Sequence, residues 1–132
     1  MPKRKPTKSA LIKKADKVFS QYIRQRNSDH RGITECFTCG KQDHWKKLQC
    51  GHFMSRRHYS TRWNETNCQV QCSACNVFRY GEQYKFSKNL NSKFGENTAE
   101  DMLILSNKTV HYDAADLLQL IEFYEKKISE LK

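Results

Sequence analysis

The chain has 132 residues, a length that suits one domain with a modest core rather than two. Hydrophobic residues make up 37% of it, with no apolar run near the ~18 residues that cross a bilayer and no secretory signal, which argues against a membrane or secreted protein. We therefore expect a soluble protein of the cytoplasm, and its net charge of +10 predicts a polyanionic partner such as DNA.

The N-terminal segment, residues 1–32, concentrates the positive charge. Residues 1–31 hold ten Lys or Arg against two Asp, a net +8 that favours binding to a phosphate backbone over a membrane surface. Apolar residues on one face predict an amphipathic helix over residues 8–26, preceded by a disordered basic tail over Met1–Thr7. On the rest of the helix surface, the candidates for phosphate contacts are Lys13, Lys14 and Lys17.

The six cysteines indicate a metal site, because a chain without a secretory signal is expected to keep its thiols reduced. Four of them form two CxxC pairs, Cys36 with Cys39 and Cys72 with Cys75. Two such knuckles predict a structural four-cysteine Zn²⁺ site with no open position for water. Cys50 or Cys68 could replace one ligand, although neither has knuckle spacing. The thirty-two residues between the pairs exceed an ordinary zinc finger and predict a functional insertion.

Residues 33–75 are rich in Thr, Phe, Tyr and Trp, which predicts short strands and loops. A helix is expected after the second knuckle, through Phe86, Leu90 and Phe94. In the C-terminal segment, residues 96–132, Asn97 with Glu100 resembles a capping box for a short helix.

The last predicted helix begins after Asp113, which is expected to cap it. Apolar residues follow at heptad spacing: Leu117, Ile121, Tyr124, Ile128 and Leu131. Just over two heptads favour packing onto the protein's own core, and the terminal helices could also form a homodimer interface.

The insertion and second knuckle together resemble an HNH endonuclease. His52 follows a predicted short strand, Asn67 opens the next one, and Asn76 directly follows the CxxC pair, which makes this the HNN variant. Cys72 to Asn76 is similar to the metal layout of phage endonuclease VII, a Holliday-junction resolvase. The longer run over residues 33–95 is closer to the NinG (Rap) recombination endonucleases of lambdoid phages, on the segments Gly51–Phe53, Thr61–Asn67, Gln71–Asn76 and Gly81.

Phosphodiester hydrolysis explains why these residue types occur together. A neutral histidine is a suitable general base near pH 7, which makes His52 the candidate for activating water; an ordinary structural histidine is the alternative. Asn76 offers a hard oxygen for a catalytic Mg²⁺ or Mn²⁺. The resemblance implies that Asn67 braces the loop carrying His52, whereas an ordinary turn residue is nearly as good an explanation.

Gly51 departs from the resemblance, because endonuclease VII-like sites have an acidic metal ligand immediately before the histidine. Another oxygen ligand is therefore needed, and Glu65 is the first choice because it lies within the matched run. The alternatives are Asp43, His58 and Glu82.

Several arginines flank the predicted site and are expected to hold DNA phosphates, unless they belong to a merely solvated basic loop. They are Arg56, Arg57, Arg62 and Arg79. Trp63 and Tyr59 could stack on unpaired bases, but core packing is the preferred interpretation.

These features predict an α+β fold, a small zinc-bound treble-clef-like ββα-metal (His-Me finger) core flanked by N- and C-terminal helices. The resemblance implies metal-dependent cleavage of branched DNA, such as Holliday junctions or D-loops, in phage recombination, with recombination proteins as possible partners. Two alternatives stay open: a noncatalytic zinc module that binds DNA or recruits recombination proteins, and an HNH nickase without structural selectivity.

Overall fold

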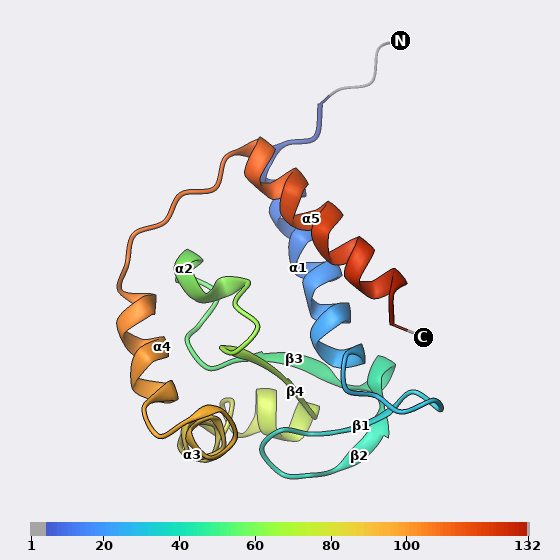
Figure 1. Ribbon diagram of the computed structural model, residues 1–132, viewed down its shortest axis with the longest axis vertical. Helices are drawn as coiled ribbons and strands as arrows, with labels where there is room; N and C mark the ends of the chain where they lie inside the picture. Colours follow the sequence, from blue (N-terminus) through green and yellow to red (C-terminus); the bar gives the residue numbers. More distant parts are fainter. Residues whose placement is uncertain (1–4, 132) are drawn as a thin grey trace.

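The computed structural model describes residues 5–131, which form a mixed α+β fold with two small antiparallel sheets (Figure 1). In chain order the elements are α1 (Lys8–Gln25), β1 (Ile33–Glu35), β2 (Gln42–His44), the 3₁₀ turn η1 (Trp45–Lys47), β3 (Gln49–His52), α2 (Tyr59–Arg62), β4 (Cys68–Gln71), the π-helical turn η2 (Ala74–Phe78), α3 (Gln83–Phe94), α4 (Thr98–Ser106) and α5 (Ala114–Ser129). Among these residues, no helix combines the length and apolar character that crossing a bilayer requires.

Helix α1 confirms the predicted amphipathic helix within one residue at its C-terminal end. Its buried residues, Leu11, Ala15, Phe19 and Ile23, recur at intervals of four and therefore share one face. The Thr7 side chain caps the helix by accepting a hydrogen bond from the Ala10 N–H at 3.1 Å. Thr7 is thus part of the cap, while residues 1–4 of the expected basic tail lie outside the described residues.

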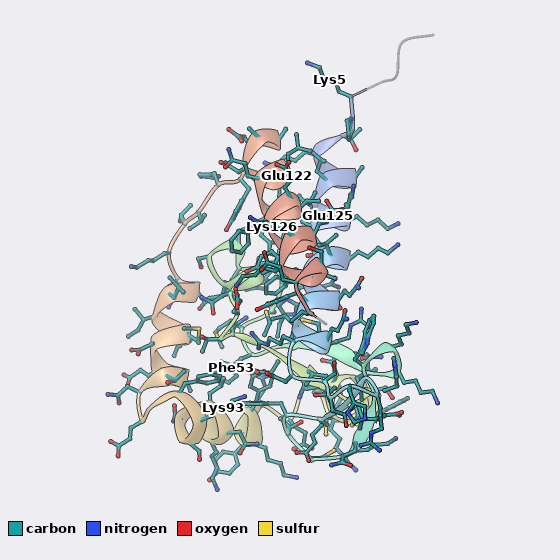
Figure 2. The ribbon with its side chains drawn as sticks, turned by 45° about the vertical axis from the view of Figure 1, so that its right-hand side comes forward. Lys5, Phe53, Lys93, Glu122, Glu125 and Lys126 are labelled. Atoms are coloured by element: carbon teal, nitrogen blue, oxygen red, sulfur yellow. The ribbon has the colours of Figure 1, made fainter. Side chains whose placement is uncertain are left out.

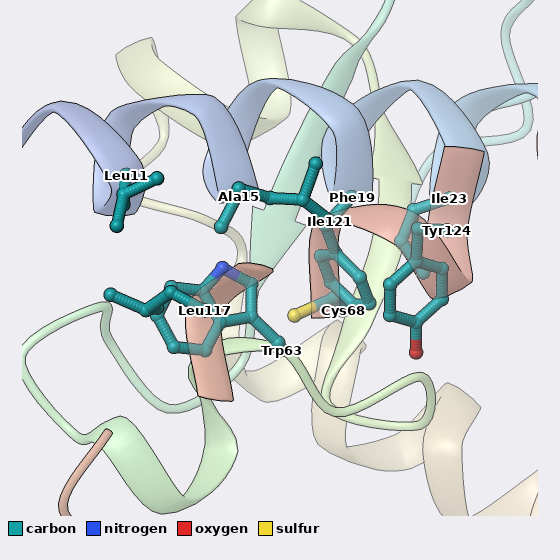
Figure 3. Packing of buried hydrophobic residues seen from close by; sticks show 9 residues of the cluster. All are labelled: Leu11, Ala15, Phe19, Ile23, Trp63, Cys68, Leu117, Ile121 and Tyr124. Carbon is teal, nitrogen blue, oxygen red and sulfur yellow. The ribbon is translucent and has the colours of Figure 1, made fainter. Parts of the chain in front are cut away.

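Helix α5 lies along α1 and closes the larger core (Figure 1). Leu117, Ile121 and Tyr124 of α5 are buried against the apolar face of α1, together with Trp63 and Cys68 from the middle of the chain (Figure 3). Asp113 caps α5 in a reciprocal capping box with Asp116. The heptad-like spacing of α5 therefore serves packing onto the protein's own core, as predicted.

Two β-hairpins fill the segment between the terminal helices. In the first, β1 pairs with β2, and the turn between them contains Cys36 and Cys39. In the second, β3 pairs with β4 so that Gly51 lies opposite Gln69 and His52 lies opposite Cys68. A second, smaller core joins the two hairpins and consists of Cys36, Leu48, Val70, Cys72 and Cys75. Because it is so small, this core depends on its cysteines.

One local expectation, the start of α4, differs from the structure. Asn97 precedes α4, but its side chain makes no capping hydrogen bond, so the predicted capping box with Glu100 is wrong. The Thr98 hydroxyl instead donates to the Gly95 carbonyl at 2.8 Å. The apolar residues of α4 are also only partly used, because Leu103 and Ile104 are exposed.

Candidate metal centre and histidine cleft

The four cysteines of the two CxxC pairs come together in one cluster. Their sulfur atoms all lie within 4.8 Å of one another, and Cys39 Sγ is 3.7 Å from Cys72 Sγ. Tetrahedral zinc with bonds of ~2.3 Å requires sulfurs about 3.8 Å apart. The cluster therefore fits a metal ion such as Zn²⁺. Cys50 and Cys68 lie outside it, so neither replaces one of the four predicted ligands.

These four thiols differ in burial and in pKa: loss of water around the sulfur raises the pKa of Cys39 to about 12 and also raises the pKa of Cys75. Cys36, Cys72 and Cys75 are buried, whereas Cys39 is exposed. Burial alone would raise the pKa of Cys36, but hydrogen bonds from the Thr38 hydroxyl and from backbone amides lower it to about 6. Cys36 is thus a thiolate at neutral pH, which is the form that binds zinc.

His52 ends strand β3 and lies beside a cleft. Its Nε2 atom is 2.9 Å from the backbone carbonyl oxygen of Arg62. A carbonyl oxygen only accepts hydrogen bonds, so we assign the proton of the neutral ring to Nε2 and the free lone pair to Nδ1. Burial lowers the pKa of His52 below 6.5, more strongly than the bond to Arg62 raises it. His52 is therefore neutral at pH 7.

Asn67 connects the chain segments on either side of the histidine loop. It is fully buried; its Oδ1 accepts from the Met54 N–H at 2.8 Å, and its Nδ2 donates to the carbonyls of Met54 at 3.0 Å and Thr61 at 3.1 Å. The Asn67 carbonyl also accepts from the Phe53 N–H at 2.9 Å. Asn67 thereby forms hydrogen bonds with Phe53 and Met54, the two residues that follow His52.

The cleft has a volume of about 480 Å³ and brings residues from α1, β3 and η2 together. It is lined by Asp16, Phe19, Ser20, Arg24, Leu48, Gln49, Cys50, His52, Arg56 and Asn76. Asn76 donates from Nδ2 to Gln49 Oε1 at 2.8 Å, which leaves Asn76 Oδ1 as an oxygen for a cation. His52 and Asn76, distant in sequence, thus line one cavity.

The structure does not bring Glu65 to this cleft. Its Oε2 accepts hydrogen bonds from the Tyr124 hydroxyl at 3.0 Å and from Lys127 Nζ at 3.3 Å, which ties Glu65 to α5. The three alternatives, Asp43, His58 and Glu82, are also absent from the residues that line the cleft. The prediction for Glu65 rested on its closeness to Asn67 in the sequence. In the structure, Glu65 precedes the buried strand β4 on the side of the hairpin that faces α5, away from the cleft.

Asp16 is the one acidic side chain among the described residues lining the cleft, and sequence analysis did not single it out. Its carboxylate accepts from Arg62 Nη2 at 2.6 Å, from Arg62 Nε at 3.0 Å and from Trp63 Nε1 at 3.0 Å. The sequence feature that could have pointed to Asp16 is that it is the one acidic residue in the basic helix α1. A cation bound beside Asn76 has this carboxylate as its candidate acidic ligand, in competition with Arg62.

Gly51 cannot simply be replaced by an acidic residue. A Cβ atom at Gly51 would collide with the side-chain amide of Gln71 on the paired strand. Gln71 is itself fixed, because it is fully buried and donates from Nε2 to Thr38 Oγ1 and to the Gly81 carbonyl, both at 3.0 Å. The glycine at this position is therefore a packing requirement, and an acidic ligand has to come from another element.

The basic side chains proposed for DNA lie in different environments. Arg56 lines the cleft and Arg57 is exposed, whereas the Arg62 side chain is largely buried in its ion pair with Asp16. Arg79 is exposed and pairs with Glu82 at 3.9 Å. Arg62 holds Asp16 and so contributes to the shape of the cleft, and the more exposed Arg56 also lies near this carboxylate, with its Nη1 atom 3.8 Å from Asp16 Oδ2. Lys13, Lys14 and Lys17 are exposed on α1.

Three aromatic side chains after Asn76 are exposed and form what we call the aromatic segment: Phe78 (76% exposed), Tyr80 (89%) and Tyr84 (75%). Tyr80 and Glu82 adopt positive φ angles of 54° and 49°, an unfavourable backbone conformation for such residues. Aromatic residues ordinarily bury in the core, and nothing in their spacing signalled this exposure.

Comparisons with known proteins agree on one group of relatives. A family model described as "Bacteriophage Lambda NinG protein" matches residues 2–132. The curated "Protein ninG" of Escherichia phage lambda is 26% identical over 127 residues, covering 95% of this chain. The chain spans 59% of that relative's length. No solved structure matches the chain.

Proposed function

Since this chain belongs to the NinG family, we propose that it is a metal-dependent endonuclease that cuts branched DNA intermediates of phage recombination. The observation that carries the proposal is the cleft that both His52 and Asn76 line, with Asn67 bracing the loop that follows His52. In this proposal β3, β4 and η2 form the ββα-metal unit of a His-Me finger, attached to the treble-clef-like zinc knuckles.

His52 is the general base of the proposed reaction. Its Nε2–H bond to the Arg62 carbonyl fixes the ring orientation and leaves Nδ1 to take a proton from water. That water attacks the phosphorus atom, the bond to the 3′ oxygen breaks, and this oxygen takes a proton from solvent, which leaves a 5′-phosphate and a 3′-hydroxyl. Asn67 acts as a positioning residue, because its hydrogen bonds reach Met54 and Thr61 rather than the cleft.

The oxygen atoms of the cleft suit a hard cation only in combination with DNA phosphate oxygens. Mg²⁺ often binds through one or two protein oxygens plus substrate phosphates and water. Asn76 and Asp16 are the residues that would hold Mg²⁺ or Mn²⁺. The cation would stabilise the negative charge that develops on the departing oxygen. Asp16 can do so only if Arg62 releases part of its carboxylate.

In this proposal, helix α1 places further positive charge beside the cleft, where the DNA backbone would pass. Asp16, Ser20 and Arg24 line the cleft, and Lys13 and Lys17 continue the same helical face by the spacing of three and four residues. Lys14 lies about 100° away from Lys13 around the helix and so points to another side. The proposed DNA path therefore follows Lys13, Lys17 and Arg56.

Replacing both Lys13 and Lys17 with Gln should weaken DNA binding and reduce its salt dependence. Each lost phosphate contact lowers the slope of log affinity against log salt by ~0.9, so the double variant should lose about 1.8. The matched control is Lys108→Gln with Lys126→Gln, which removes the same charge from exposed positions elsewhere (Lys126 in Figure 2). Equal slopes for wild type and the Lys13/Lys17 variant, measured by fluorescence anisotropy, would contradict this DNA path.

The aromatic segment gives the preference for branched DNA a physical basis. It begins two residues after Asn76; Arg79 lies between Phe78 and Tyr80, and Lys85 and Lys88 follow Tyr84. Exposed aromatic rings beside cations bind unpaired bases by stacking, and branched DNA offers such bases at its branch point.

Tyr80→Ala should therefore weaken binding to a four-way junction by about 1–3 kcal/mol, the usual value of one stacked base. Affinity for linear duplex, whose bases stay paired, should change little. Phe94→Ala removes another exposed aromatic side chain outside the segment and serves as the control. If Tyr80→Ala weakens junction and duplex equally in a binding titration, the segment does not read the branch.

Resolution of a junction requires two cuts, and we propose a symmetric dimer in the host cytoplasm for this purpose. Leu118 and Phe123 leave exposed apolar surface on α5. Recombination proteins are the other candidates for that surface.

Cutting assays with the purified protein and Mn²⁺ test the proposal on a four-way junction and a linear duplex of matching sequence. Faster cutting of the junction supports the proposal, and equal cutting of both supports the unselective nickase. Binding without cutting would favour the noncatalytic zinc module, which is supported by the neutralisation of Asp16 through Arg62.

A further inference from the structure

A second group of potential metal ligands lies on the β3–β4 hairpin. Cys50, His52 and Cys68 each offer a ligand atom, and these atoms all lie within 4.8 Å of one another. The hairpin geometry explains the cluster. Cys50 and His52 are two residues apart on β3 and so share one face of the sheet, and Cys68 lies directly opposite His52 on β4.

We propose that Cys50, His52 and Cys68 form a second metal site, separate from the four-cysteine cluster, that binds a soft divalent cation such as Zn²⁺ and thereby inhibits the enzyme. The binding part of this proposal stands on the cluster itself. The inhibition part rests on the proposed function, because it requires His52 to be the general base.

The donor set selects the metal. Two thiolates and an imidazole suit Zn²⁺ or Co²⁺, whereas Mg²⁺ and Mn²⁺ prefer oxygen ligands. Two thiolates also balance the charge of the cation. Each of the two cysteines releases its thiol proton to solvent when the metal binds. The site is thus chemically distinct from the oxygen ligands of Asn76 and Asp16 in the same cleft.

The cleft provides the route of entry. Cys50 and His52 line it, while Cys68 is fully buried on the far side of the cluster. A metal that enters from the cleft would meet all three ligands at its inner side and keep its fourth position toward the cleft. Three protein ligands with one open position is a common zinc arrangement, in contrast to the closed four-cysteine site.

Metal binding and general-base catalysis exclude each other at His52. A neutral imidazole has one nitrogen with a free lone pair. Whichever nitrogen binds the cation, that lone pair is used and the ring can no longer accept a proton from water. Zn²⁺ above one equivalent should therefore slow cleavage by ~10²-fold or more, the lower range for loss of a general base.

The binding test uses the whole 132-residue chain with one equivalent of zinc in the four-cysteine site. Titration with Co²⁺, followed by thiolate-to-cobalt absorption, should show a second equivalent bound in wild type. Loss of outer-shell partners alone costs ~10–100-fold in metal affinity, so loss of a ligand in Cys50→Ser should cost at least about a hundredfold. Ser20→Ala, which changes another cleft side chain, should bind like wild type.

His52→Ala provides a second variant that leaves both cysteines in place, and it should also lose the second equivalent. Failure of the zinc-loaded wild type to bind any Co²⁺, or unchanged Co²⁺ binding in both Cys50→Ser and His52→Ala, overturns the site. Cleavage is then measured with added Zn²⁺ and compared with each variant's own rate without it. Binding of the second equivalent without slower cleavage overturns the inhibition. Absence of cleavage under every condition counts against the proposed function, whereas the Co²⁺ titration still decides the site.

Discussion

Cys75→Ser is expected to leave the chain unfolded at 25 °C. Cys75 is fully buried in the smaller core, where four of its neighbours are Cys36, Leu48, Val70 and Cys72. A structural zinc contributes about 10–16 kcal/mol to the folding of small zinc domains. Whole domains are typically stable by only about 5–15 kcal/mol, so loss of one of the four ligands removes most of the margin.

Circular dichroism and metal analysis measure this effect. Wild type should contain one zinc per chain at the four-cysteine cluster, and a strong chelator should reproduce the unfolding of Cys75→Ser. Cys50→Ser makes the same chemical change outside this cluster and should stay folded. A well-folded wild-type protein free of zinc would rule out this role for the metal.

His52→Ala is expected to lower the rate of junction cleavage by ~10²–10⁴-fold, the usual contribution of a positioned general base. Junction affinity should stay within a few-fold of wild type, because Arg56, Lys13 and Lys17 remain. His111→Ala removes an exposed histidine before α5 and should cut normally. Added Mn²⁺ should not rescue His52→Ala, since a cation cannot accept the proton of water.

The pH dependence of wild-type cleavage gives an independent readout of the same residue. Because burial lowers the pKa of His52 below 6.5, more than half of the rings are still unprotonated at pH 6.5. Cleavage should therefore persist at pH 6.5 and decline only at lower pH. If His52→Ala, freed of contaminating nucleases, cuts at the wild-type rate, His52 is not the base.

Local patterns in the sequence predicted the elements that depend on local chemistry. The four-residue intervals of α1 predict its buried face, and the Asp113 signal predicts the start of α5. The CxxC spacing predicts the cysteine cluster, because each knuckle places two sulfurs together without help from distant residues. The capping box at Asn97 failed because the Thr98 hydroxyl turns back to Gly95 and the Asn97 side chain makes no cap bond.

The acidic side chain in the cleft and the position of Glu65 depend on contacts between distant residues, and the sequence did not predict them, although it did predict His52 and Asn76. Asp16 meets Arg62 across 46 positions, so neither the acidic side chain in the cleft nor the burial of Arg62 could be read from local spacing. Glu65 is close to Asn67 in sequence, yet it binds Tyr124, which is 59 positions away. Each of these positions depends on how α1 and α5 pack against the hairpin.

The measurement that tests the central claim most directly is the cutting of an end-labelled four-way junction by the wild-type protein, with Mn²⁺ and with EDTA. The chemistry proposed for His52 and Asn76 predicts discrete cuts near the branch point with Mn²⁺, products with 5′-phosphate and 3′-hydroxyl ends, and no cuts with EDTA. A folded protein that holds one zinc, in the four-cysteine cluster, and binds the junction but leaves every strand intact with Mn²⁺ and with Mg²⁺ would contradict it.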